Sequence, residues 1–215
     1  MATVSPVSNE ARNVLYEVAW HTYLELRGNP ENYHLRMTYD RGTLEIMSPS
    51  PRHENYARCI DLLIGVWTEE FNIPCCGLRQ MTCKREDFEK GLEPDDCYYV
   101  QSTAKVRKKI EIDFAVDPPP DLAVEVEVSQ SSVRKAPIYA ALGVRELWRY
   151  DGETLRIFEL VDGQYQGREG SVCFPNFPVA KAEEVIQQIG EIDDTTFKRR
   201  FRRWVRKTFS TGRNH

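Results

Sequence analysis

The sequence predicts an α/β or α+β fold with a mixed β-sheet. Extended and helical patterns alternate from Leu122 to Tyr150, which indicates a strand–helix–strand unit. The chain has 215 residues, the size of one domain with a terminal extension. Hydrophobic residues make up 41% of it and charged residues 29%, a composition that excludes disordered and collagen-like chains.

The N-terminal part predicts a helix, a hairpin and a second helix. Apolar residues recur at the helical period over residues 9–27, and Gly28 and Pro30 end this helix. Residues 34–39 and 43–47 alternate apolar and polar side chains around a turn, which predicts a β-hairpin.

The second helix begins after the sequence SPSP at residues 48–51. Ser50 is suited to cap its free amides, and Pro51 suits its first position. The apolar stripe of this helix, extended back by one turn, reaches His53. We therefore expect this histidine to face the interior.

The rest of the chain predicts further strands and helices. Strands are expected at residues 97–100, 110–115, 122–128, 144–150 and 154–160, and helices at residues 137–143, 180–190 and 193–209. Asp151 and Gly152 form a hairpin signal between the last two strands. We expect residues 1–178 to form the main domain and residues 179–215 a helical extension.

The charge of the chain is unevenly distributed. Residues 195–215 hold eight basic residues and no acidic ones, so the first 194 residues hold 21 basic and 33 acidic residues, a net charge of −12. The last helix is amphipathic, and its apolar side is expected to pack on its own domain or on a second subunit. The alternative is a helix that contacts DNA. Candidate contacts to nucleic acid are Lys105, Arg107, Lys108, Lys109, Arg199 and Arg203.

No apolar run approaches the roughly 18 residues that a membrane span needs. The N-terminus lacks the basic and apolar regions of a secretory signal. The six cysteines form no Cys-x-x-Cys pair. We expect a cytoplasmic protein with free thiols and no membrane partner.

Acidic residues form the candidate site. Glu125 and Glu127 are two apart on an expected strand, so their side chains point the same way. They either meet solvent on a polar face or bind a divalent cation, for which Mg²⁺ is the natural choice. Asp95 and Asp96 follow Pro94 at the start of another strand and either lie beside Glu125 or form a turn.

Four segments carry a resemblance to a known family. They are residues 48–53 (SPSPRH), 93–95 (EPD), 119–126 (PPDLAVEV) and 139–150 (YAALGVRELWRY). With these motifs the chain resembles the Uma-type restriction endonucleases, a large bacterial family within the PD-(D/E)xK nuclease superfamily. The resemblance covers about residues 15–165 and is most specific from Pro119 to Tyr150.

The resemblance implies a restriction-endonuclease-like fold, a mixed β-sheet flanked by helices. To this core the chain adds an N-terminal helix and hairpin and a C-terminal basic amphipathic helix. The resemblance also implies a hydrolase in which Mg²⁺, or Mn²⁺ in its place, activates water to cut a phosphodiester. The expected substrate is DNA, with RNA as an alternative, and a homodimer is expected because many nucleases of this superfamily pair to cut two strands.

The resemblance also assigns candidate residues. Asp95 and Glu125 match the metal-binding carboxylates, while Glu127 stands where the superfamily has a lysine. Lys135 matches the lysine that replaces it. Glu127 is expected to be a further metal ligand or to hold Lys135. His53 is expected to be a proton shuttle, a partner of a carboxylate, or simply a buried histidine.

Two other classes of function stay open at this point. The glutamate at position 127 and the acidic body are consistent with an inactive nuclease fold that serves as a binding or assembly module. A metal-dependent enzyme for a small phosphorylated or acidic substrate is the third reading.

Overall fold

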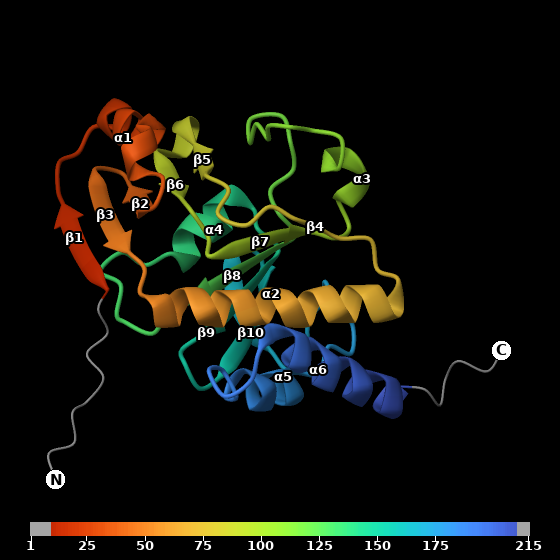
Figure 1. The fold of residues 1–215 in the computed structure, drawn as a ribbon. Coiled ribbons are helices and arrows are strands. Elements are labelled where there is room, and N and C mark those ends of the chain that lie inside the picture. Colours follow the sequence, from red (N-terminus) through yellow and green to blue (C-terminus); the bar gives the residue numbers. More distant parts are fainter. Residues whose placement is uncertain (1–9, 210–215) are drawn as a thin grey trace, which may run out of the picture.

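A computed structural model describes residues 10–209, and these form two β-sheets and six α-helices (Figure 1). The first sheet is antiparallel and has the order β1-β3-β2-β6-β5. Its strands are β1 (Ala11–Leu15), β2 (Arg36–Asp40), β3 (Thr43–Ser48), β5 (Cys83–Arg85) and β6 (Lys90–Leu92). The hairpin of β2 and β3 confirms the sequence prediction.

The second sheet is mixed and has the order β11-β10-β9-β8-β7-β4. Its strands are β4 (Cys76–Gly77), β7 (Asp96–Tyr99), β8 (Leu122–Val126), β9 (Glu146–Tyr150), β10 (Leu155–Val161) and β11 (Gln164–Arg168). Only β8 and β9 are parallel among these pairs, and α4 (Ala136–Leu142) connects them. This confirms the predicted strand–helix–strand unit and the mixed sheet.

Strand β8 lies at the centre of the molecule, and all five of its residues are buried. Leu122, Val124 and Val126 face the largest apolar core, which α2 (Pro51–Phe71) shares. Ala123 faces a second core with Ile138 and Leu142 of α4. Glu125 in this strand therefore sits between packed layers, so the alternative of a solvated polar face is wrong for Glu125, whereas Glu127 is partly exposed.

Helix α2 spans the length of the second sheet (Figure 1). It begins as predicted: Pro51 is its first residue, and the Ser50 hydroxyl accepts a hydrogen bond from the backbone N–H of His53 at 3.2 Å. The other helices are α1 (Trp20–Gly28), α3 (Thr103–Val106), α5 (Val179–Ile186) and α6 (Asp194–Phe209), with 3₁₀ turns at Pro30–Asn32 and Glu86–Phe88.

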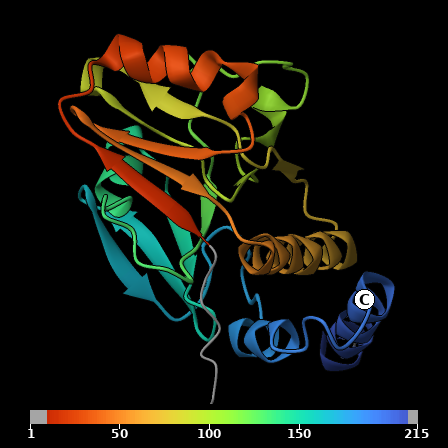
Figure 2. The same cartoon turned by 60° about the vertical axis from the view of Figure 1, so that its left-hand side comes forward.

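The C-terminal helices pack on α2, and Figure 2 shows them beside it. Phe197, Phe201 and Val205 of α6 are buried in the same core as Trp67 of α2. Arg58 of α2 pairs with Asp194 at the start of α6. The apolar side of this helix thus packs on its own chain, one of the two placements expected. No helix within residues 10–209 is long and apolar enough to cross a bilayer.

Two predicted elements are wrong. The helix expected over residues 9–27 is split: Ala11–Leu15 pairs antiparallel with β3, and only Trp20–Gly28 is helical. The edge of β3 offers backbone hydrogen-bond partners to Ala11–Leu15, which the local sequence pattern of this segment does not reveal. Glu17, with a φ of +57°, then turns the chain between the strand and the helix. The strand expected at residues 110–115 is a loop, in which Ile110 is fully exposed and Phe114 is buried.

Candidate active site

Two carboxylates from neighbouring strands meet at one end of β8. Strands β7 and β8 are antiparallel with Asp96 opposite Val124, a register that places Asp95 opposite Glu125. The backbone N–H of Val126 donates to Asp95 Oδ2 at 2.7 Å. Asp95 is 4% exposed and Glu125 1%, so both acids are removed from water. The expected proximity of Asp95 and Glu125 is confirmed.

His53 lies on the first turn of α2 between two carboxylates. Its Nε2 is 2.8 Å from Asp95 Oδ1, and its Nδ1 is 2.9 Å from Glu10 Oε1. The side chains of all three residues are fully buried. The prediction that His53 faces the interior is confirmed. Glu10, by contrast, was not expected, because its segment was predicted to be helical.

Two residues of the α4 region bind Glu125. Lys135, which directly precedes α4, places its Nζ 2.5 Å from Glu125 Oε2, and the Tyr139 hydroxyl donates to Oε1. Lys135 and Tyr139 are four residues apart, so the start of α4 brings both to the same carboxylate. Lys135 thus lies beside Glu125 as expected, whereas the sequence motif assigns no role to Tyr139.

Burial and neighbouring charges act in opposite directions on these groups. Burial alone would raise the pKa of Asp95, but contact with His53 and the charge of Lys135 lower it to about 2. Burial raises the pKa of Glu125 to about 7, against the opposing charge of Lys135. Burial would lower the pKa of Lys135, but Glu125 and Asp95 raise it. The pKa values of the two carboxyl groups are therefore shifted in opposite directions, down for Asp95 and up for Glu125.

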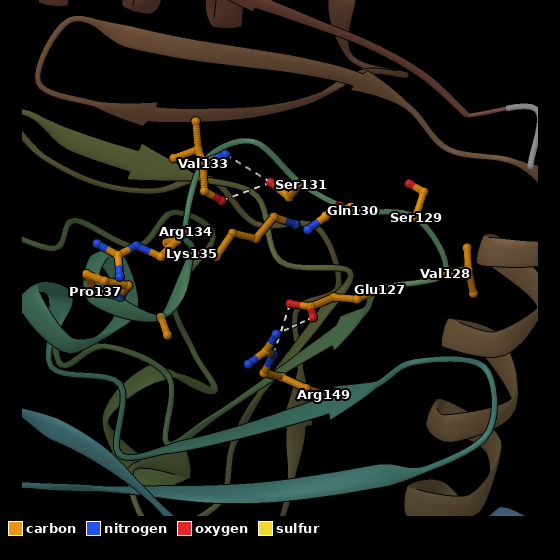
Figure 3. A pocket seen from close by; sticks show the side chains of 11 residues that line it. Glu127, Val128, Ser129, Gln130, Ser131, Val133, Arg134, Lys135, Pro137 and Arg149 are labelled. Atoms are coloured by element: carbon orange, nitrogen blue, oxygen red, sulfur yellow. Dashed lines mark hydrogen bonds and ion pairs between the residues drawn. The ribbon is translucent and has the colours of Figure 1, made fainter.

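Glu127 follows the end of β8 and makes a different contact. Its carboxylate accepts a hydrogen bond from Arg149 Nε at 3.0 Å and also pairs with the terminal guanidinium nitrogen of that residue. Figure 3 shows this pair at the wall of a pocket of about 610 Å³. The pocket is lined by Glu127, Val128, Ser129, Gln130, Ser131, Val133, Arg134, Lys135, Ala136, Pro137 and Arg149.

A buried carboxylate of the first sheet holds the loop between β8 and α4. Glu45 of β3 accepts hydrogen bonds from the Ser131 hydroxyl at 2.8 Å and the Ser132 backbone N–H at 2.7 Å. Arg12 of β1 pairs with Glu45 at 2.8 Å and donates to the Ser129 hydroxyl at 2.9 Å. The two sheets are thus joined beside Lys135. A charged residue within a predicted strand was the only sequence signal for Glu45.

The donor set is compatible with a hard divalent cation. Mg²⁺ is usually held by one or two carboxylates and keeps several waters. Asp95 Oδ1 is buried and close to His53 Nε2 and to Arg36 Nε at 3.7 Å, yet neither nitrogen is aligned to donate to it. Among residues 10–209 no three histidine, cysteine, aspartate or glutamate side chains form a metal-binding cluster. The residues fit an ion that is bound by two carboxylates and keeps several waters, rather than an ion that is surrounded by protein ligands alone.

The basic residues expected to contact nucleic acid lie elsewhere. Lys105 is in α3, and Arg107, Lys108 and Lys109 follow it; all four are exposed. Figure 1 shows α3 beyond the end of β7 that is remote from Asp95. Arg199 and Arg203 are exposed on α6. The structure brings none of these residues to the carboxylates.

Comparisons with known proteins found a similar solved structure and a matching family. A crystal structure from Anabaena variabilis, described as a putative nuclease of the DUF820 family, shares the fold with a TM-score of 0.50 at 15% sequence identity. The match covers 76% of this chain and 92% of that one. No curated protein matches the chain. The model of the Uma2 family, described as "putative restriction endonuclease", matches residues 20–190, and the chain belongs to this family.

Proposed function

We propose that this protein is a Mg²⁺-dependent endonuclease that hydrolyses phosphodiester bonds in DNA, with Mn²⁺ as a substitute ion. The observation that carries the proposal is the convergence of Asp95, Glu125 and Lys135 at one end of β8. Burying two carboxylates and one ammonium costs desolvation free energy, and such clusters are concentrated at functional sites. Family membership supports the same reaction class.

Asp95 and Glu125 would hold the ion, which when bound supplies charge stabilisation and a more acidic water. Asp95 suits this task because its low pKa keeps it ionised at any physiological pH. Glu125 is oriented by Tyr139 and Lys135, whose contacts fix both of its oxygens. The protein thus presents carboxylate oxygens in fixed positions, so little reorganisation is needed during the reaction.

Lys135 is the cation nearest to the carboxylates and faces the pocket as well. Its ammonium group would bind a phosphoryl oxygen of the substrate and stabilise the charge that develops during cleavage. His53 lies against Asp95 on one side and is hydrogen-bonded to Glu10 on the other, so it would hold Asp95 in position. We propose these roles for Lys135 and His53, and for Glu127 the orientation of Arg149 at the pocket wall.

The proposal also includes surfaces that lie away from the carboxylates. Lys105, Arg107, Lys108, Lys109, Arg199 and Arg203 would attract DNA without contacting the scissile phosphate. The homodimer expected from the superfamily would need a surface other than the buried apolar side of α6.

Cleavage assays test this proposal. The purified protein should nick or cut plasmid DNA, or cut single-stranded DNA or RNA, with Mg²⁺ or Mn²⁺ and not with EDTA. Glu125→Gln should abolish the activity, and Glu159→Gln, which changes two ion pairs on β10, should keep it. Equal cleavage by the wild type and Glu125→Gln would indicate a contaminant. Binding of nucleic acid without any cleavage would favour the inactive binding module.

A further inference from the structure

The pocket beside Lys135 presents hydrogen-bond donors that the protein does not use. Within residues 10–209 the guanidinium of Arg134 has no ion-pair or hydrogen-bond partner, and neither has the amide of Gln130. Both side chains are exposed and line the pocket. Figure 3 shows Arg134 on the side of the pocket opposite Ser129. Donors at a pocket wall that no protein group uses are free to bind a ligand with several acceptor oxygens.

The charge of the pocket favours an anion. Its lining contains Arg134, Lys135 and Arg149 against a single acid, Glu127, which Arg149 already pairs. Lys135 pairs with Glu125, and in the proposed function its ammonium group serves the phosphoryl group that is cut. Arg134 is therefore the cation that remains available, on a chain whose first 194 residues have a net charge of −12. A planar guanidinium suits the oxygens of a phosphate.

The depth of the carboxylates limits the shape of the substrate. Asp95 and Glu125 are almost completely buried, and Lys135, which contacts Glu125, is itself 8% exposed and lines the pocket. A phosphate of regular duplex DNA lies on the convex outside of a stiff double helix, away from such a recess. A single strand bends freely and can place one phosphate and its nucleotide inside.

The size of the pocket agrees with one nucleotide. Its volume of about 610 Å³ lies within the range of pockets that bind small molecules. Val128, Val133 and Pro137 add apolar surface to the polar lining, against which a base can rest. The pocket therefore combines a site for a phosphate with a face for a base.

We propose that this pocket receives one unpaired nucleotide of single-stranded nucleic acid and that Arg134 binds a phosphate next to the one that is cut. The position relative to the cut rests on the proposed nuclease function, whereas the binding of a single strand by Arg134 does not. Gln130 donates a further hydrogen bond to the bound strand.

Fluorescence anisotropy tests the binding without catalysis. A labelled oligonucleotide and a hairpin duplex of the same length are titrated with the full chain in EDTA at low salt. We expect the single strand to bind at least tenfold more tightly. Arg134→Gln should weaken this binding about tenfold and reduce the slope of log affinity against log salt by about 0.7. Arg168→Gln removes the same charge from β11 and should leave the binding unchanged.

The outcomes separate the two proposals. Equal affinity for both forms, equal binding by Arg134→Gln and the wild type, or no binding of the single strand would overturn the assignment of the pocket. Binding through Arg134 without cleavage in Mg²⁺ would keep the pocket and reject the nuclease. Cleavage of plasmid together with tight duplex binding would keep the nuclease and reject the pocket.

Discussion

Asp95 and Glu125 face each other across the antiparallel pair of β7 and β8, and the amide of Val126 is bonded to Asp95. The register of two strands therefore fixes the spacing of the carboxylates. Each acid has its own positioning partner, His53 for Asp95 and Lys135 for Glu125.

Lys135→Met should reduce the rate of cleavage by at least about 100-fold, because it removes a charge that stabilises the transition state. Without the ammonium group the pKa of Glu125 rises further, so this carboxyl is protonated at neutral pH. Single-turnover cleavage at saturating substrate measures the effect. Lys135→Arg, which keeps the charge, should retain more activity than Lys135→Met, and the reverse order would contradict the role of the charge.

Glu45→Gln should loosen the loop of residues 129–134. The substitution removes the charge that Arg12 pairs with and weakens the bonds to Ser131 and Ser132. Trypsin should then cut between Arg134 and Lys135 several-fold faster, as followed by mass spectrometry. In the nuclease assay, Glu45→Gln should lower kcat more than it changes KM.

Glu146→Gln provides the matched control for this experiment. Glu146 is also a buried carboxylate that holds a loop through a serine hydroxyl and backbone N–H groups, at Ser171, Val172 and Cys173. The Glu146→Gln substitution should leave the rate of trypsin cutting after Arg134 unchanged. If Glu45→Gln leaves that rate unchanged too, Glu45 does not hold the loop.

Asp96→Asn should stabilise the protein above pH 6 and lose this advantage at low pH. Burial raises the pKa of Asp96 to about 6, and Asp61 adds to the increase. Between the ordinary aspartate pKa of 3.8 and the raised pKa of about 6, the folded protein therefore binds more protons than the unfolded chain. Its free energy of unfolding falls as the pH rises through this window. The difference between variant and wild type should be on the order of 1–3 kcal/mol at pH 8.

Urea unfolding at pH 4 and pH 8 measures this difference. Both values are obtained for the wild type and Asp96→Asn under the same salt conditions. A difference in the free energy of unfolding that does not change with pH would show that the charge of Asp96 is not responsible.

Phe201→Ala should destabilise the whole domain by about 3 kcal/mol. Phe201 is fully buried in the core that α6 shares with α2. Unfolding should remain a single transition when followed by both far-ultraviolet and tryptophan signals. Arg199→Ala, an exposed change on the same helix, should shift stability by less than about 0.5 kcal/mol. A separate early transition for the helices would show that α6 unfolds independently.

The parts of the fold that the sequence predicts correctly are those with strong local signals. Ser50 and Pro51 mark the start of α2, and Gly143, with a φ of +79°, ends α4. Strand β1 escaped prediction because its backbone partners belong to β3, more than twenty residues away. A short edge strand with few apolar residues has no local pattern of its own.

The site likewise contains residues that local sequence signals identify and residues that they do not. Motifs identify Asp95, Glu125 and Lys135, and the position of His53 on the apolar stripe of α2 predicts its burial. Glu10 and Glu45 depend on contacts between distant segments, because they meet His53 and the loop after β8 only in the folded chain. No local pattern reports such contacts. The partner of Glu127, Arg149, likewise follows from the pairing of β8 with β9.

The most direct test of the account is X-ray diffraction from crystals soaked with Mn²⁺, measured for anomalous scattering. For a metal-dependent nuclease, an anomalous peak should lie at a carboxylate oxygen of Asp95 and one of Glu125, and it should disappear in Asp95→Asn. Ordered crystals that show Mn²⁺ bound elsewhere, or no peak between these two side chains, would contradict the proposed metal-dependent nuclease.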